Sequence, residues 1–179
     1  MRMSLILPVA AAVTALIGLP GLAFAETKLK DVVRAELPDV IAAPGEPVLA
    51  TIHAQGAQVY ECKAEKSGKL AWQFREPIAT LFVDGKTVGR HYAGPNSELA
   101  DSSGVIGKVV GRAPGAMPAD IPLLKLVVIS RRGAGQLAKA ATIQRLNTRG
   151  GVADGSCETP GAFLSVPYAA DYVFRKKRD

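Results

Sequence analysis

The feature that most constrains the fold is a hydrophobic period of two, which begins at Pro47 and continues almost to the end of the chain. A period of two is typical of β-strands, whereas helices repeat about every 3.6 residues. With Gly- and Pro-rich turns between the segments, the pattern predicts about nine short strands and little helix. We therefore expect an all-β protein, either an antiparallel β-sandwich or a closed barrel. The last predicted strand places four apolar residues on one face: Tyr168, Ala170, Tyr172 and Phe174.

The sharpest local signal is the dipeptide Asp-Gly at positions 84–85, which lies between two β-type runs. It favours a two-residue type I′ hairpin turn, because both central residues of that turn need a positive φ. Such a turn pairs Leu81 with Val88 on one face of the hairpin. It pairs Phe82 with Thr87 on the other.

Residues 1–25 have the layout of a secretory signal peptide. Arg2 precedes an apolar run at 5–22, and Ala-Phe-Ala at 23–25 offers a cleavage site before Glu26. The alternative is an uncleaved membrane anchor, which the Pro and Gly residues within the run disfavour. We expect a mature chain that starts near Glu26 and is exported to a periplasm or to the extracellular medium. It contains no predicted transmembrane segment.

Three parts follow from this interpretation: the signal peptide at 1–25, a lead-in segment at 26–46, and a single β domain at 47–179. The lead-in has helical potential at 29–37. The domain ends in a basic run, Arg-Lys-Lys-Arg at 175–178, in a chain of formal net charge +6. That run is either a solvated tail or a site of attraction to an anionic surface such as a cell envelope. Nucleic acid is not an expected partner, because no aromatic residues are interleaved with the basic ones and the chain is exported.

The chain has two cysteines, Cys62 and Cys157. An even number in an exported protein predicts one disulfide between them. The two histidines and two cysteines show no zinc-ligand spacing. We therefore expect no metal and no cofactor.

His91 is the best single candidate for chemistry, since it precedes a Gly-Pro turn and is close in sequence to Glu98 and Asp101. A histidine beside a carboxylate could act as a general acid or base. The alternative is a histidine that only makes structural hydrogen bonds at the base of a loop. No Gly-x-Ser-x-Gly motif is present. We therefore assign no catalytic residues.

A polar string on a later predicted strand, at 144–148, is the second candidate. Alternation places Gln144 and Thr148 on one side of the strand and Arg145 and Asn147 on the other. The functional interpretation is a hydrogen-bonding patch for a polar ligand such as a sugar. The structural alternative is that these side chains satisfy loops and strand ends.

Several strings resemble a known family. Two strings are the most specific: Val-Gly-x-His-Tyr-x-Gly-Pro at 88–95 and Ile-Gln-Arg-Leu-Asn-Thr-x-Gly-Gly at 143–151. Tyr60, Trp72 and the two cysteines also occur in the order typical of that family. The chain resembles, over about 47–174, the exported family catalogued as domain of unknown function 3455. The resemblance implies an exported domain without an established activity and supplies no catalytic residues. The chain departs from the family pattern at Ser97, where a Trp is usual.

We interpret the chain as a binding or envelope-associated module for a polar ligand such as a glycan, whose identity the sequence does not give. The predicted ligand-binding residues lie beside strand ends that lead into Gly-rich loops, where rigid β folds present polar groups. The alternative function is a small extracytoplasmic enzyme, hydrolase-like, that uses His91 with a nearby carboxylate. We expect four residues to converge at one end of the domain: His91, Asp101, Arg145 and Asn147.

Overall fold

The computed structural model describes residues 37–178. The predicted signal peptide and the helical potential at 29–36 lie outside the described residues. No helix within 37–178 is long and apolar enough to cross a membrane. The described chain forms eight β-strands: β1 (Val48–Ala64), β2 (Leu70–Val83), β3 (Lys86–Tyr92), β4 (Asn96–Leu99), β5 (Gly104–Ala113), β6 (Leu123–Arg132), β7 (Thr142–Gly150) and β8 (Phe163–Arg175).

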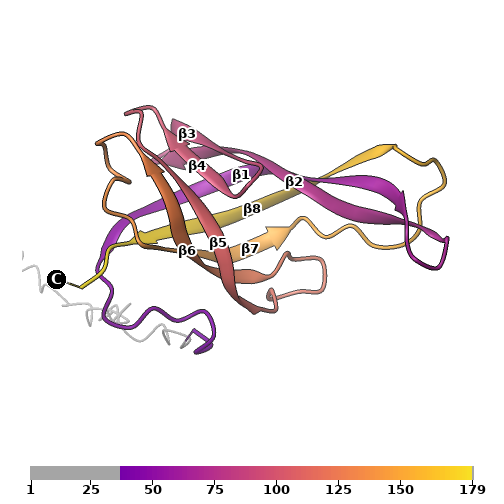
Figure 1. Cartoon of the computed structure of the whole chain (residues 1–179), viewed down its shortest axis with the longest axis horizontal. Coiled ribbons are helices and arrows are strands. Elements are labelled where there is room, and N and C mark those ends of the chain that lie inside the picture. Colours follow the sequence, from indigo (N-terminus) through magenta and orange to yellow (C-terminus); the bar gives the residue numbers. More distant parts are fainter. Residues whose placement is uncertain (1–36, 179) are drawn as a thin grey trace, which may run out of the picture. The chain divides into compact units, whose positions relative to one another are not determined.

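The eight strands form one closed antiparallel barrel (Figure 1). Each strand pairs with its neighbours in sequence, and β8 returns to pair with β1. The prediction of an all-β antiparallel fold is therefore confirmed, and the barrel is the one of the two predicted architectures that forms. Closure pairs every strand on both sides along the barrel wall, so it removes the open sheet edges that a sandwich would keep.

Fewer strands form than the nine or so predicted, because β1 continues through a glycine and β2 through a proline, residue types that often end a strand. Gly56 lies within β1, where a Cβ would collide with the backbone of Ile78 on β2, so only glycine fits. Pro77 lies within β2 and pairs with β1 alone, because the pairing of β2 with β3 begins at Ala79. A proline is tolerated at such a one-sided position since it has no N–H to donate. The shortest strand, β4, has four residues.

The hairpin between β2 and β3 contains the expected Asp-Gly turn. Both central residues have positive φ angles, 49° and 73°, as a type I′ turn requires. Phe82 pairs with Thr87 as predicted. Leu81 pairs with Gly89 and not with Val88, because a β-bulge between positions 81 and 82 shifts the register by one residue.

The paired ends of β1 and β2, residues 60–76, project beyond the barrel as an arm, and the first residues of β8 pair with its base at Tyr60 and Glu61 (Figure 1). Cys62 in the arm forms a disulfide with Cys157, with Cα atoms 5.8 Å apart, which confirms the predicted pairing. The backbone N–H of Cys62 also donates to the carbonyl of Ala162. The disulfide therefore fastens the arm to the connection between β7 and β8.

Residues 37–46, the described part of the lead-in, pack against the outside of the barrel. Ile41 is fully buried, and its carbonyl accepts a hydrogen bond from Gln144 Nε2 at 2.6 Å. Lys125 Nζ donates to the carbonyl of Ala42 at 2.6 Å. Arg175, the first residue of the basic run, donates to Gln144 Oε1. The start of that run is thus bound to the barrel wall.

Most of the barrel interior is a continuous apolar core. Ile52, Leu81 and Phe174 point inward and are fully buried. Leu137, from the connection between β6 and β7, packs into the same core. Its backbone N–H donates to Ser103 Oγ, which fixes this connection over the end of the barrel away from the arm. The interior is less tightly filled at the opposite end, beside the arm.

Candidate functional site

A cavity of about 380 Å³ lies inside the barrel at the end beside the arm. Its walls come from seven of the eight strands, all but β4, and from two connections, 94–95 and 121–122. Apolar side chains form much of the lining, among them Val109, Leu124 and Leu126. The polar or charged lining residues are Gln58, Tyr60, Arg75, His91, Arg112, Arg145 and Tyr172.

Strand register explains why Tyr172, Arg145 and Arg112 face the cavity. Tyr172 on β8 pairs with Arg145 on β7, Arg145 pairs with Leu124 on β6, and Leu124 pairs with Arg112 on β5. Ile52 on β1 continues the same line beyond Tyr172. Residues paired across neighbouring strands point to the same face. We call this line of five inward-facing residues the polar row.

Arg145 is the buried cation of the site, with 9% of its surface exposed. Its Nε and Nη2 donate to the carbonyl of Pro122 at 3.1 and 2.8 Å. No carboxylate among residues 37–178 forms an ion pair with it. A guanidinium stays charged at every relevant pH and carries five N–H groups, so its charge and some of its donors are available to a further partner.

His91 lines the same cavity and is 4% exposed. Its Nδ1 lies 3.2 Å from Ser97 Oγ, and its ring stacks at a tilt on Tyr172, with centroids 4.6 Å apart. Burial, and then the positive charge of Arg145, lower the pKa of His91 to about 4. The imidazole is therefore neutral at pH 7 and offers a hydrogen bond, not a charge.

The carboxylate expected beside His91 is elsewhere. Glu98 Oε2 accepts hydrogen bonds from Arg90, Arg132 and Tyr92 on the outside of the barrel. Those contacts hold the pKa of Glu98 below its usual range, with the hydrogen bond from Arg90 contributing most. The ring nitrogen of His91 instead meets the hydroxyl of Ser97.

Three polar atoms near Arg145 lack protein partners. Gln58 Nε2 and the Tyr172 hydroxyl are buried at the cavity wall, each in a residue 2% exposed, and neither makes a hydrogen bond. The hydroxyl of Tyr168 lies beside both and is also unpaired. The Tyr172 hydroxyl lies near Tyr168 and Arg145, and the Tyr168 hydroxyl lies near Gln58, but none of the three atoms makes a hydrogen bond of normal geometry. Burial is the main reason that the pKa values of both tyrosines are raised, and Arg145 opposes the rise.

Such atoms are uncommon, because buried polar groups are normally paired. Of the five in the described residues, three are this group beside Arg145. Tyr60, on the same wall, shows the normal case, since its hydroxyl donates to the carbonyl of Gly151 at 2.6 Å. The buried polar groups without hydrogen-bond partners are therefore concentrated at this end of the interior.

Asp101 does not lie at this cavity. Its Oδ1 accepts hydrogen bonds from the backbone N–H and hydroxyl of Ser103, and its Oδ2 accepts one from the backbone N–H of Gln136. These bonds hold the pKa of Asp101 below its usual range, the hydroxyl of Ser103 contributing most. Asp101 thus joins two connections at the end of the barrel away from the arm.

Asn147 does not share a face with Arg145, contrary to the prediction. Asn147 and Thr148 together oppose the single residue Ala170 in a β-bulge, and Asn147 has a φ of 50°. The bulge interrupts the alternation and turns Asn147 to the outside. Its Nδ2 donates to Asp171 Oδ2 at 2.8 Å, beside the contact of His53 with the same carboxylate. Of the four predicted residues, the structure therefore brings together His91 and Arg145 only.

Sequence reasoning missed Gln58, Arg112 and Tyr172 as site residues. The period of two on β1 does place Gln58 on the face of Tyr60, so a glutamine among inward positions was the available signal. Arg112 joins the site because β5 extends to Ala113 and pairs Arg112 with Leu124. Nothing in one sequence could show that the hydroxyl of Tyr172 has no partner.

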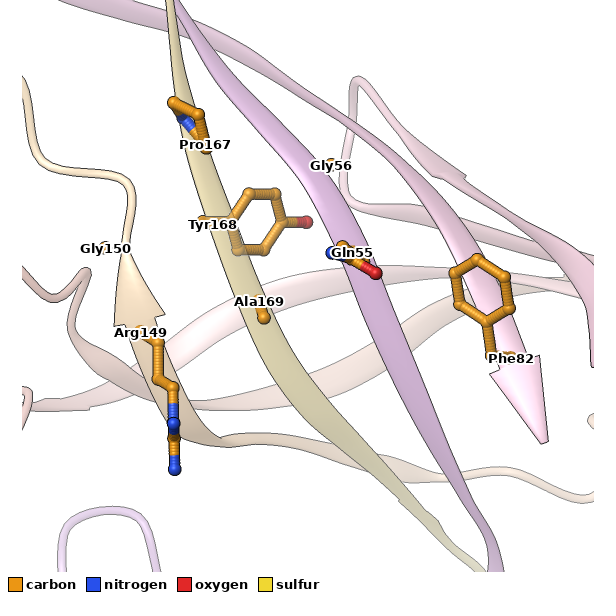
Figure 2. Close-up of a pocket in the computed structure, with 8 residues that line it drawn as sticks. All are labelled: Gln55, Gly56, Phe82, Arg149, Gly150, Pro167, Tyr168 and Ala169. Carbon is orange, nitrogen blue, oxygen red and sulfur yellow. The ribbon is translucent and has the colours of Figure 1, made fainter. Parts of the chain in front are cut away.

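A second hollow, of about 560 Å³, lies on the outer face of the barrel where β1, β8 and β7 pass side by side. Figure 2 shows Gln55, Ala169 and Arg149 along it, with the Tyr168 ring extending from β8 toward β1. Arg149 and Gln55 are exposed to solvent. Tyr168, whose buried hydroxyl is unpaired, lines this hollow as well, but the hollow lacks a buried arginine such as Arg145.

Within 37–178 no group of three or more His, Cys, Asp or Glu side chains is placed to hold a metal ion. The fold and cavity together define a closed β-barrel with a polar interior cavity at one end. The family described as Protein of unknown function (DUF3455) matches residues 43–176, and the chain belongs to that family. No curated protein matches the chain, and no solved structure does.

Proposed function

We propose that this chain is an exported binding protein that takes up a small polar molecule in the cavity inside its barrel. The observation that carries the proposal is the pair of unpaired polar groups at the cavity wall, Gln58 Nε2 and the Tyr172 hydroxyl. Leaving a buried donor unpaired costs about 1–3 kcal/mol. A bound ligand that pairs with these groups would offset that cost, which a purely structural interior would have no reason to carry.

The size and lining of the cavity agree with this function. Ligand cavities are typically about 300–1,000 Å³ and combine apolar walls with a few placed polar groups. Eight-stranded barrels have room for one small ligand when side chains leave part of the interior open. A volume of about 380 Å³ suits a single small molecule better than a glycan chain. A sugar unit remains within the polar class of ligand that the proposal covers.

Export is part of the proposal. The predicted signal peptide supports it, and so does the disulfide Cys62–Cys157, because disulfides persist in oxidising compartments. A role at a cell envelope would use the exposed end of the basic run, at 177–178. The enzyme alternative lacks support, since His91 contacts Ser97 and the two candidate carboxylates bind other groups.

The test can be carried out before the ligand is identified. The mature protein is exported in a bacterial host and purified, and the small molecules released on denaturation are identified by mass spectrometry. The informative variant is Val109→Phe, which fills the cavity from its apolar wall. The matched control is Val127→Phe, which adds the same volume at an exposed position on β6.

We expect a compound that co-purifies with the wild-type protein and with Val127→Phe, and that is lost from Val109→Phe. Circular dichroism and the melting temperature of each variant show that the barrel is intact. If no compound is enriched with the wild type over a folded Val109→Phe, the interior cavity is not a ligand site and the proposal is wrong.

A further inference from the structure

We infer that the ligand of the interior cavity is a small organic monoanion, with a carboxylate as its head and an apolar body. This inference rests on the proposed function and adds the chemical class of the ligand. It starts from the charges around the cavity. The lining contains three arginines, Arg75, Arg112 and Arg145, and no aspartate or glutamate.

The three arginines differ in how their charge is balanced. Arg75 contacts Glu76 at 3.2 Å and Glu61 at 4.0 Å, so the arm neutralises it. Arg112 and Arg145 form no ion pair with any carboxylate of the described part of the chain. Arg112 is exposed, where water screens its charge, whereas Arg145 is buried. One uncompensated charge is therefore enclosed in the barrel.

The partners of Arg145 leave that charge in place. The Pro122 carbonyl accepts from Nε and Nη2, but a carbonyl is a dipole and not a counter-ion. His91 cannot compensate, because its imidazole is neutral at pH 7. An isolated buried charge is costly, and a guanidinium cannot escape the cost by losing its proton. A negatively charged ligand head beside Arg145 is the arrangement that removes this cost.

The unpaired groups around Arg145 can all donate a hydrogen bond. Gln58 Nε2 carries two N–H groups, and the Tyr172 hydroxyl carries one O–H. A carboxylate accepts about four hydrogen bonds and suits the planar fork of an arginine. A cationic ligand would instead meet Arg145 and Arg112 with no acidic group to bind. The polar groups of the cavity thus complement an anion.

The apolar part of the lining defines the rest of the ligand. Val109, Leu124 and Leu126 form an apolar wall, which a hydrated inorganic anion would not use. One enclosed charge matches one negative charge, which favours a carboxylate over a doubly charged phosphate ester. The exposed Arg112 lies on the polar row nearer the solvent, two strands from Arg145, and would attract an anion toward the cavity.

The experiment compares acids with their uncharged amides. Benzoate and benzamide, phenylacetate and phenylacetamide, and hexanoate and hexanamide are titrated into the mature protein, with phenyl phosphate as the doubly charged member. Binding is measured by the shift in melting temperature and by calorimetry. We expect the carboxylates to bind and their amides to bind at least about tenfold more weakly, as the loss of a charge-assisted hydrogen bond implies. Phenyl phosphate should bind less well than the carboxylates.

Three arginine variants locate the anion. Arg145→Gln should weaken carboxylate binding about ten- to hundredfold, as the loss of a charged hydrogen-bond partner implies. Arg145→Lys keeps the charge and should lose less, which separates a charge effect from a folding defect. Arg112→Gln should lower affinity less and reduce its salt dependence. Arg149→Gln, on the outer hollow of Figure 2, is the control and should bind as the wild type does.

The outcomes separate this inference from the proposed function. If amides bind as well as acids, or if the compound that co-purifies is neutral or cationic, the anion is rejected and the binding function stands. If Arg149→Gln loses binding and Arg145→Gln does not, the anion lies on the outer surface and the inference is wrong. If no carboxylate binds and no compound co-purifies with the wild type, both proposals fail.

Discussion

Two neighbouring rows of inward-facing residues run around the same five strands of the barrel, and their chemistry is opposite. The apolar row joins one residue from each strand through the register: Ala50, Phe174, Ile143, Leu126 and Val109. The polar row lies two residues farther along on four of the strands, and three on β5, where a bulge intervenes: Ile52, Tyr172, Arg145, Leu124 and Arg112. The apolar row has no polar side chain, whereas the polar row contains two arginines and a tyrosine.

The backbone does not explain this difference, because both rows use the same strands and the same face. What differs is how each row is satisfied. The apolar row lies in the core that Leu137 joins from the connection between β6 and β7, so it stabilises the fold by excluding water. The polar row holds a buried cation without a counter-ion and a hydroxyl without a partner. The apolar row stabilises the barrel, and the polar row has the properties of a binding site within it.

The largest predicted effect concerns the apolar row. Phe174→Ala removes a fully buried ring and should lower the free energy of unfolding by about 3–5 kcal/mol. Urea unfolding followed by circular dichroism measures it. The control is Phe163→Ala on the same strand, where the ring is exposed and the expected loss is below about 1 kcal/mol. Equal losses at the two positions would show that the apolar row is not the core of the fold.

The next effect concerns protonation beside the polar row. The pKa of His91 is about 4 in the folded protein against 6.5 for an unperturbed histidine. The unfolded state therefore binds more protons between these values, so stability is complete above about pH 6.5 and falls as the pH drops toward 4. The difference corresponds to about 3 kcal/mol.

His91→Gln should remove most of this dependence between pH 6.5 and 5. Urea unfolding of both proteins at pH 7, 6 and 5 measures it. Asp101 and Glu98 have lowered pKa values, so their contribution is lost at more acidic pH, as each carboxyl protonates. A variant that keeps the full pH slope in this window would show that His91 is not held neutral by burial.

A smaller effect tests the closed end of the barrel. Asp101→Ala removes the acceptor for three donors on Ser103 and Gln136, and should lower stability by about 1–2 kcal/mol. Ligand binding should not change, because Asp101 lies away from the cavity. Calorimetric titration with the compound that co-purifies measures whether the affinity for the ligand is unchanged. If the variant loses affinity but keeps its stability, Asp101 belongs to the binding site, and its assignment to the other end of the barrel is wrong.

The fold is predictable from the sequence because its signals are local. The period of two, the Asp-Gly turn and the inward face of β8 depend on neighbouring residues, and the structure confirms them. The disulfide follows from a count of two cysteines. The two β-bulges that matter most, after Leu81 and at Asn147, leave no comparable pattern, and each changes the register beyond it.

The site is less predictable for the same physical reason. His91 and Arg145 stand out as polar residues beside strand ends, and they do line one cavity. Alternation assigns Asn147 to the face of Arg145, but the bulge breaks that alternation. Arg112 and Gln58 join the site through pairing between strands, which a single sequence does not reveal. Whether a buried polar group has a partner is a property of the assembled barrel alone.

The smallest predicted effect compares two tyrosines on the cavity wall. The hydroxyl of Tyr60 donates to the Gly151 carbonyl, whereas that of Tyr172 has no partner. Tyr60→Phe should therefore cost about 1–2 kcal/mol, because it leaves a carbonyl unpaired. Tyr172→Phe removes a buried group that already lacks a hydrogen bond, so stability should stay the same or rise by up to about 1 kcal/mol. Its affinity for the ligand should fall. Thermal unfolding without ligand measures the stability of each variant, and titration with the ligand measures its affinity. A Tyr172→Phe variant as destabilised as Tyr60→Phe would mean that its hydroxyl is paired in solution and that the polar row supports the barrel, as the apolar row does.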